Sequence, residues 1–195
     1  MEDIVLVGGG GHCRSCIDVI EQEGRFKIVG VVDMADKIGQ DIFGHVIIGC
    51  DEQLPVFVRQ YRNFLITVGQ IESPALRLKL YKTIKSLGGN LPVIISPRAY
   101  VSVHALVGAG TIVMHNVTVN AAARVGCNCI LNTGCLIEHD AVVGNHCHIS
   151  THGVVNGTAT VGDGSFVGSN ATVVNNIKLG ENSFVRSTSL ARKSQ

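Results

Sequence analysis

An aliphatic residue recurs at every sixth position of this chain from Ile95 to Val185, without one change of phase. An unbroken hexapeptide period predicts a parallel β-helix, in which each repeat forms one short strand and stacked coils bury a continuous core. The period therefore predicts the architecture of the C-terminal half of the chain. Its sixteen positions are Ile95, Val101, Val107, Val113, Val119, Val125, Leu131, Ile137, Val143, Ile149, Val155, Val161, Val167, Val173, Leu179 and Val185.

A small residue follows each aliphatic residue at a fixed distance. Four positions later, fourteen of the sixteen places hold Ala, Gly, Ser, Thr or Cys, and Val117 and Ile177 are the exceptions. We expect a small side chain where the chain turns a corner and leaves no room for a larger one. Cys129, Cys135 and Cys147 fall at this position, so we interpret them as packing residues. Seven cysteines at irregular spacing indicate reduced thiols, not a disulfide framework.

The length of one coil predicts which residues stack. A three-sided β-helix uses three hexads for each coil, so residues 95–190 would form about five coils. Residues 18 apart in the sequence should then lie above one another, at the strand spacing of roughly 4.8 Å. This register places Gly157 above His139, with open space where a side chain would be.

The first 90 residues follow a different pattern. Apolar runs at 4–7, 27–32 and 64–68 are predicted strands, and helical patterns follow the first run, ending near Gly24, and occupy 73–87. Alternating strands and helices predict a small parallel, Rossmann-like α/β sheet. Gly and Pro punctuate the sequence after residue 87, so we predict two domains, 1–90 and 91–195.

Charge and composition exclude several classes of protein. Sixteen basic and fifteen acidic residues give a net charge of +1, and neither sign forms a run, so a nucleic-acid partner is not expected. No apolar span reaches 18 residues, and the acidic start of the chain lacks the basic segment of a signal peptide. We expect a soluble cytoplasmic protein with no membrane partner.

A run of four glycines, Gly8–Gly11, separates the first predicted strand from its helix. Free backbone N–H groups and the helix dipole can hold a phosphate there, with His12 facing the same ligand. Asp33 ends the second strand and could accept hydrogen bonds from a sugar or base hydroxyl. The spacing is not G-x-G-x-x-G, and a tight turn is the alternative. For the C-x-x-C of Cys13 and Cys16 we favour buried packing over a redox or zinc site.

His139 is the candidate general base. Its neighbours Glu138 and Asp140 can orient the imidazole and raise its basicity, which suits proton transfer near neutral pH. His148 would lie beyond the next corner, where it could donate a hydrogen bond to a thioester-bound ligand.

The other histidines carry weaker hypotheses. We expect His146 and His152 to point to solvent and leave His115 undecided. A zinc trio would need two histidines five positions apart, and no pair has that spacing. No Ser or Cys shows the base partner that a covalent route would need.

These motifs resemble those of the PglD/NeuD-type bacterial sugar acetyltransferases. The resemblance covers nearly the whole chain and rests on the loop 7–12, Asp33, Gly69 and the stretch 131–148. It implies a left-handed β-helix, acetyl-CoA as co-substrate, no metal, and a homotrimer with active sites in clefts between neighbouring β-helices.

The resemblance also implies roles for individual residues. His139 would be the general base with Asp140 as its carboxylate partner, and Asn132 would lie near the acceptor amine. His148 and the backbone N–H of Gly157 would contact acetyl-CoA, the latter at the thioester carbonyl. The nucleotide of the sugar substrate would be held by Gly10, Gly11, His12, Asp33 and Gly69.

The implied reaction is acetylation of a nucleotide-linked amino sugar for a surface glycan, by direct attack of the amine on the thioester. The nucleotide base and the sugar stay open, because backbone contacts to phosphate carry no base information. Two alternatives also stay open: O-acetylation of a sialic-acid-like sugar, and a non-catalytic trimeric sugar-nucleotide binder.

The C-terminal segment departs from the family pattern. Family members usually continue past the position of Val185 with Gly, Ala and a Val-Pro tail that covers CoA, whereas this chain reads Arg186-Ser187-Thr188-Ser189-Leu190. The adenine end of the CoA site therefore stays open: either the protein binds CoA less completely, or this C-terminal segment is altered or shortened relative to the natural one.

Overall fold

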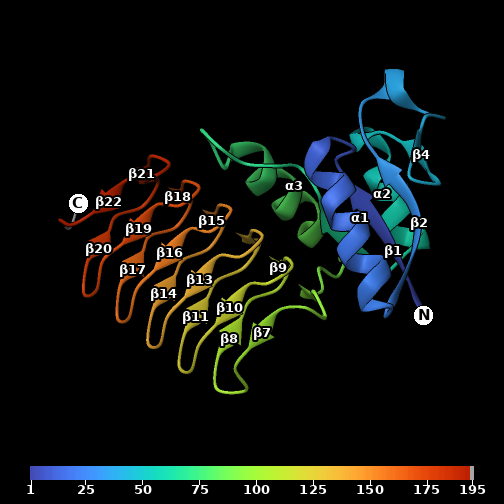
Figure 1. Ribbon diagram of the computed structural model, residues 1–195. Coiled ribbons are helices and arrows are strands. Elements are labelled where there is room, and N and C mark those ends of the chain that lie inside the picture. The colour runs from blue at the N-terminus through green and yellow to red at the C-terminus, as the bar shows by residue number, and fades with distance from the viewer. Residues whose placement is uncertain (194–195) are drawn as a thin grey trace.

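The computed structural model describes residues 1–193, which form an α/β part followed by a long three-sided β-helix (Figure 1). None of the helices in this range is both long and apolar enough to cross a membrane. The fold class expected from the sequence is confirmed in both halves.

The N-terminal sheet has five strands in the order β3-β4-β2-β1-β5. All neighbouring strands are parallel except β3 and β4, which form an antiparallel hairpin at one edge. The three predicted strands are present as β1, β2 and β5, whereas the short hairpin was not predicted. The bounds are β1 (Glu2–Val7), β2 (Phe26–Val32), β3 (Asp41–Ile42), β4 (His45–Gly49) and β5 (Asn63–Ile66).

Helices cover both faces of this sheet. Ile4 and Leu6 of β1 pack with α1 (Gly11–Glu23), whereas Val5 and Val7 pack with α2 (Leu54–Gln60) and α3 (Ala75–Ser86). Burial on both faces explains why β1 is a continuous apolar run. Helix α1 ends at Gly24, whose φ of 72° is the left-handed conformation that glycine adopts readily.

The β-helix consists of two-residue strands in three parallel sheets of six, six and five strands. Strands pair with those one coil away, so Ile137 lies beside Val155 as the 18-residue register predicts. The chain completes between five and six coils, slightly more than expected.

We call the three sheets I, II and III, in the order in which the chain enters them. Sheet I contains β6 (Ile94–Ile95), β9 (Ile112–Val113), β12 (Ile130–Leu131), β15 (His148–Ile149), β18 (Phe166–Val167) and β21 (Phe184–Val185). Sheet II contains β7 (Tyr100–Val101), β10 (Thr118–Val119), β13 (Leu136–Ile137), β16 (Val154–Val155), β19 (Thr172–Val173) and β22 (Leu190–Ala191). Sheet III contains β8 (Leu106–Val107), β11 (Arg124–Val125), β14 (Val142–Val143), β17 (Thr160–Val161) and β20 (Lys178–Leu179).

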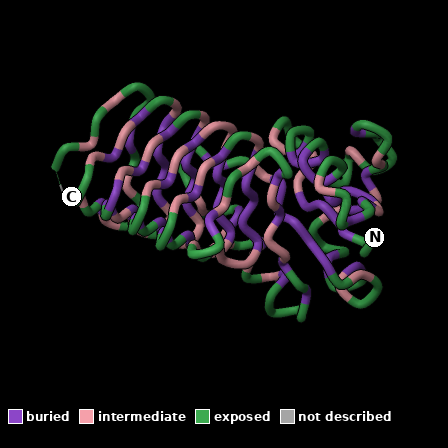
Figure 2. The backbone as a smooth tube through the Cα atoms, turned by 60° about the horizontal axis from the view of Figure 1, so that its bottom comes forward, coloured by how far each residue is buried: buried purple, intermediate pink, exposed green. Residues whose placement is uncertain are grey.

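The corners of the coil explain the small residues. Three positions after each repeat aliphatic the backbone commonly has positive φ, for example 59° at Asp140 and 61° at Thr158. The small residue that follows then points into the core, and Cys129, Cys135 and Cys147 are fully buried free thiols. Their predicted packing role is confirmed. Figure 2 shows the resulting alternation of buried strands and exposed corners along the coils.

The α/β part lies against sheet I. The outward-facing Ile112, Ile130 and His148 of this sheet are buried, whereas the corresponding Leu106 and Val142 of sheet III are exposed. Sheet I is therefore the covered side of the prism, and the corner between sheets II and III is the one opposite the α/β part.

Candidate functional site

His139 lies at the corner between sheets II and III, two residues after β13. Its Nδ1 is 2.9 Å from Oδ2 of Asp140, and the two side chains are 61% and 56% exposed. Because a carboxylate only accepts, Nδ1 carries the proton and Nε2 keeps a free lone pair. The hydrogen bond to Asp140 raises the pKa of His139, and the negative charges of Asp140 and Glu138 act in the same direction. The side chain therefore has the tautomer that a general base needs.

Gly157 lies directly above His139, as predicted. The space that a side chain at residue 157 would occupy is not open, however, because the imidazole of His139 fills it. A Cβ at residue 157 would lie 2.8 Å from Nε2 and 2.9 Å from Cε1 of His139. Glycine is therefore required here if the ring is to keep this position. The N–H of Gly157 donates to no acceptor within residues 1–193, and the residue is buried beneath the His139 ring.

Asp33 folds back onto the glycine-rich loop. Its Oδ2 accepts from the backbone N–H of Gly9 at 2.9 Å and from Nζ of Lys37 at 3.2 Å, and its Oδ1 accepts from the N–H of Met34 at 2.8 Å. A Cβ at residue 9 would lie only 2.5 Å from Oδ2 of Asp33. The loop can approach the carboxylate this closely because residue 9 is glycine.

The loop leaves open space at the start of α1. No heavy atom comes within 4 Å of a Cβ built at Gly10 or Gly11, and Gly10 caps the helix without a side-chain hydrogen bond. His12 follows at the first turn and lies close to Gly69, where a Cβ would be 3.7 Å from Cβ of His12. Burial lowers the pKa of His12 to about 3, and the nearby charges of Arg77 and His148 lower it further. His12 is therefore neutral at physiological pH.

The C-x-x-C pair packs inside the domain. Cys13 and Cys16 are fully buried, and burial raises the pKa of Cys13 to about 11. The Sγ of Cys16 is 3.4 Å from Nε2 of His12 in the same helix. The predicted packing role is confirmed for both thiols.

His148 lies beneath the α/β part, on the outer face of sheet I. Its Nδ1 donates to the backbone carbonyl of Gln70 at 2.5 Å, and its Nε2 accepts from Nδ2 of Asn132 at 3.2 Å. Burial lowers the pKa of His148 to about 4, so the ring is neutral and has no second N–H to donate. The expected donation from His148 to a thioester is not supported by this geometry. The pairing with Asn132 instead joins two predicted site residues.

Arg77 is a buried cation that the sequence reading missed. It is 1% exposed, and its guanidinium donates to the carbonyls of Ile66 and Val68 at the end of β5 and to the carbonyl and Oδ1 of Asn128 in the β-helix. All of these acceptors are neutral, and Nε has no partner within residues 1–193. Arg77 thus fastens the two parts of the chain together. In the sequence, the only indication of this role is that Arg77 lies on the apolar side of the predicted helix 73–87.

His146 and His152 were both expected to point to solvent, and the structure separates them. His146 was expected to face solvent, but its Nδ1 accepts from Nδ2 of Asn128 at 3.0 Å and its ring packs edge-on against Tyr81 of α3, with centroids 5.2 Å apart. That prediction is wrong, because α3 covers this corner. His152 is exposed, as expected.

The undecided His115 links α1 to the first coil. Its Nδ1 is 2.6 Å from Oγ of Ser96, and its Nε2 is 2.7 Å from Oδ2 of Asp18. The sequence showed no Ser or Cys with the base partner that a covalent route would need, but the fold brings Ser96 to His115. Ser96 is nonetheless only 1% exposed and its Oγ also accepts the N–H of Arg98, so the group acts as an interdomain contact and not as an accessible nucleophile.

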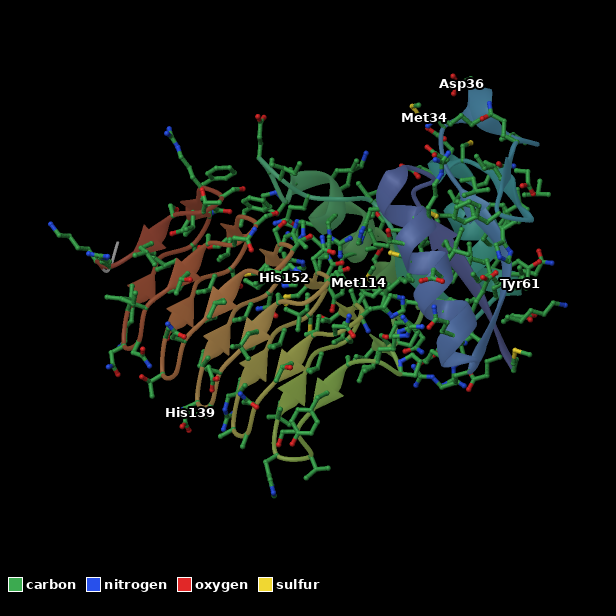
Figure 3. All side chains as sticks on the ribbon, in the orientation of Figure 1. Met34, Asp36, Tyr61, Met114, His139 and His152 are labelled. Atoms are coloured by element: carbon green, nitrogen blue, oxygen red, sulfur yellow. The ribbon has the colours of Figure 1, made fainter. Side chains whose placement is uncertain are left out.

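The predicted site residues form two separate groups within one chain. His12, Gly69, Asn132 and His148 lie where the α/β part meets sheet I, and the loop 8–11 with Asp33 lies at the carboxyl edge of the N-terminal sheet, whereas His139, Asp140 and Gly157 lie at the opposite corner. Figure 3 shows His139 on the side of the β-helix away from the helices. Within residues 1–193, no three His, Cys, Asp or Glu side chains form a group that could hold a metal ion.

Comparison with known proteins supports the resemblance to sugar acetyltransferases noted in the sequence. A family model of the PglD N-terminal domain matches residues 3–84. The structure is similar to that of a mutant perosamine N-acetyltransferase from Caulobacter crescentus in complex with CoA and GDP-perosamine, with 28% identity and a TM-score of 0.92, covering 100% of this chain and 90% of that one. No curated protein sequence gives a significant match.

A second structure shares the fold. It is the acetyltransferase domain of PglB from Neisseria gonorrhoeae FA1090 in complex with acetyl coenzyme A, with 22% identity and a TM-score of 0.86, covering 100% of this chain and 98% of that one. Both of these solved structures are acetyltransferases, and their similarity extends over the α/β part and the β-helix of this chain. The chain is therefore similar to the PglD/NeuD-type sugar acetyltransferases, through a PglD-type N-terminal domain at residues 3–84 and through the fold of the whole chain.

Proposed function

We propose that this protein transfers the acetyl group of acetyl-CoA to the amino group of a nucleotide-linked sugar, with His139 as the general base. The observation that carries the proposal is the corner itself: the hydrogen bond to Asp140 leaves Nε2 of His139 unprotonated, and Gly157 leaves room for the ring. The similarity to the perosamine N-acetyltransferase supports the choice of an amino sugar over a sialic-acid-like hydroxyl.

The reaction needs no covalent enzyme intermediate. The sugar amine attacks the thioester carbonyl carbon, a C–N bond forms, and Nε2 of His139 takes the proton from the nitrogen. The N–H of Gly157 is a donor for the oxyanion that develops on the carbonyl oxygen. The C–S bond then breaks, and the imidazolium returns the proton to the departing thiolate of CoA.

The nucleotide is assigned to the α/β part, residues 1–90. Gly10 and Gly11 offer free space and backbone N–H groups at the start of α1, where the helix dipole favours a diphosphate. Asp33 is placed for the ribose, and Gly69 and His12 border the path from the loop towards Asn132 and the sugar.

A second copy of the chain must complete the site, because His139 lies on the far side of the β-helix from its own nucleotide domain. Sheet II, which borders the His139 corner, presents an uncharged outer row that a copy can bury. We therefore propose a homotrimer in which the nucleotide domain of one copy faces His139 of the next. The outer row is Tyr100, Thr118, Leu136, Val154, Thr172 and Leu190.

The decisive experiment measures thiol release from acetyl-CoA in the presence of UDP-, GDP- and dTDP-linked amino sugars. We expect turnover with one of these, and a fall of about 10²–10⁴-fold for His139→Ala. His152→Ala is the matched control, since His152 is also an exposed corner histidine, and should keep full turnover.

The alternatives predict other results. Turnover with CMP-sialic acid alone would support O-acetylation, and nucleotide binding without any turnover would support the non-catalytic binder. Turnover that survives His139→Ala would remove the general-base assignment.

A further inference from the structure

A cleft next to the glycine-rich loop begins at Asp33, the residue proposed for the ribose, and extends beyond it to residues that have no role in the reaction described above. It has a volume of about 300 Å³ and lies at the carboxyl edge of the N-terminal sheet. This is the small end of the range for ligand sites, so it suits a base with its ribose and not a whole nucleotide sugar. Its apolar wall includes Val68, Leu76 and Leu80, of which Leu76 is a largely exposed leucine.

Three strands that are neighbours in the sheet and run parallel, β1, β2 and β4, end at this edge. The phosphate loop follows β1, Asp33 follows β2, and Cys50–Glu52 follow β4. Ligands of open α/β sheets bind across the carboxyl ends of such strands. A nucleotide whose diphosphate lies on the loop and whose ribose lies at Asp33 therefore reaches the segment after β4 with its base.

Only one carboxylate of the cleft is free to receive the base. Asp33 is occupied by Gly9, Met34 and Lys37, and Glu52 lies beside the thiol of Cys50. Among residues 1–193 the carboxylate of Asp51 forms no hydrogen bond or ion pair, although the charge of Lys79 acts on it; its backbone carbonyl accepts from the N–H of Leu54. Partial burial, and then the charge of Glu52, raises the pKa of Asp51, as expected of a carboxylate in a cleft without a paired donor.

We infer that Asp51 reads the base and selects guanine, so that the sugar donor is GDP-linked. A carboxylate accepts two parallel hydrogen bonds, and guanine is the nucleobase whose edge offers two adjacent donors, N1–H and the N2 amino group. Uracil and thymine present one imide N–H between two carbonyl oxygens that repel a carboxylate. Adenine and cytosine present one amino group beside an acceptor nitrogen. The inference rests on the proposed function and adds the nucleotide class to it.

Calorimetric titration of the full chain with nucleoside diphosphates tests this. GDP should bind roughly 10- to 100-fold more tightly than UDP, CDP, dTDP or ADP, the discrimination of one good bidentate contact. Inosine diphosphate lacks only the N2 amino group and should bind about tenfold more weakly than GDP.

Asp51→Asn should remove most of the difference between GDP and inosine diphosphate and should tighten UDP binding, because an amide does not repel the carbonyl oxygens of uracil. The matched control is Glu52→Gln, the neighbouring carboxylate of the same segment, which should keep the wild-type preference. The inference is overturned if another diphosphate binds more tightly than GDP, if inosine diphosphate equals GDP in the wild type, or if Asp51→Asn keeps the preference.

Failure of the base assignment and failure of the proposed function are separable. If a UDP- or dTDP-linked amino sugar is acetylated and its diphosphate binds best, the enzyme assignment stands and the guanine inference falls. If GDP binds with the expected preference but no amino sugar is acetylated, the base assignment stands and the proposed reaction falls.

Discussion

The imidazole of His139 fills the space that a side chain at Gly157 would take, one coil further along the β-helix. Two residues 18 apart in the sequence are thus a single stereochemical unit. Nε2 of His139 lies on the exposed side of this corner, and the unpaired N–H of Gly157 lies behind the ring in a buried residue.

This relationship predicts the effect of Gly157→Ala. The new Cβ would lie 2.8 Å from Nε2, so the ring must swing away from its position. We expect turnover to fall about 10²-fold, the cost of misplacing a catalytic group by roughly 1 Å. The melting temperature should stay close to that of the wild type, because the group that moves is the end of an exposed side chain. Unchanged turnover would show that Nε2 of His139 is not the base.

The pH dependence of turnover should report the pair of His139 and Asp140. The base works unprotonated, and Asp140 raises its pKa above 6.5, so kcat/KM should rise with pH through a value above 6.5. Asp140→Asn keeps a hydrogen-bond acceptor but removes the charge, and should move this limb to lower pH. Glu138→Gln should move it in the same direction by less, because Glu138 acts only through its charge. A limb that stays in place in Asp140→Asn contradicts the assignment.

Arg77→Met should destabilise the protein strongly. The change leaves the carbonyls of Ile66 and Val68 and the side chain of Asn128 without their buried donor. Each buried acceptor left without a donor costs about 1–3 kcal/mol of unfolding free energy. Urea denaturation measures this, with Lys79→Ala, an exposed change on the same helix, as a control expected to stay within about 0.5 kcal/mol. Equal stability of both variants would show that Arg77 does not hold the domains together.

The contact between Asp18 and His115 should contribute to stability in a defined pH range. The hydrogen bond from His115 lowers the pKa of Asp18 below 3.8, so the folded state favours the charged carboxylate. The contribution is present above pH 3.8 and is lost as the pH falls through the lowered folded value. Asp18→Asn should therefore flatten the loss of thermal stability in that acid range. An unchanged acid profile would mean that the contact adds nothing to folding.

The β-helix was predicted correctly because each strand contributes one inward side chain, which makes the period visible without any tertiary information. The 18-residue register followed from the same period, and the pairing of Ile137 with Val155 confirms it. The position of Gly157 could be predicted, but the ring that fills the space above His139 could not, because stacking register says nothing about side-chain rotamers.

Contacts between the α/β part and the β-helix could not be predicted from the sequence. His146 looks like any other corner residue of the repeat, and only the packing of Tyr81 from α3 removes it from solvent. Arg77 meets acceptors from residues 66, 68 and 128, which are brought together by the fold alone. The hairpin was missed because β3 has only two residues, too few to show a period, and the five residues of β4 were not recognised as a strand.

The 18-residue coil also makes the molecule adjustable in discrete steps. A duplication or loss of one whole coil would keep every strand on its own sheet and change the length by roughly 4.8 Å. A change of six or twelve residues would keep the aliphatic phase but rotate all later strands to another side of the prism. Coils added after Gly157 would leave His139 where it is, whereas coils added before β13 would carry it along the axis, away from the nucleotide domains. The distance along the axis between the nucleotide domain and His139 can therefore change only by whole coils. This restricts which insertions and deletions such a protein can accept in evolution and still keep its site.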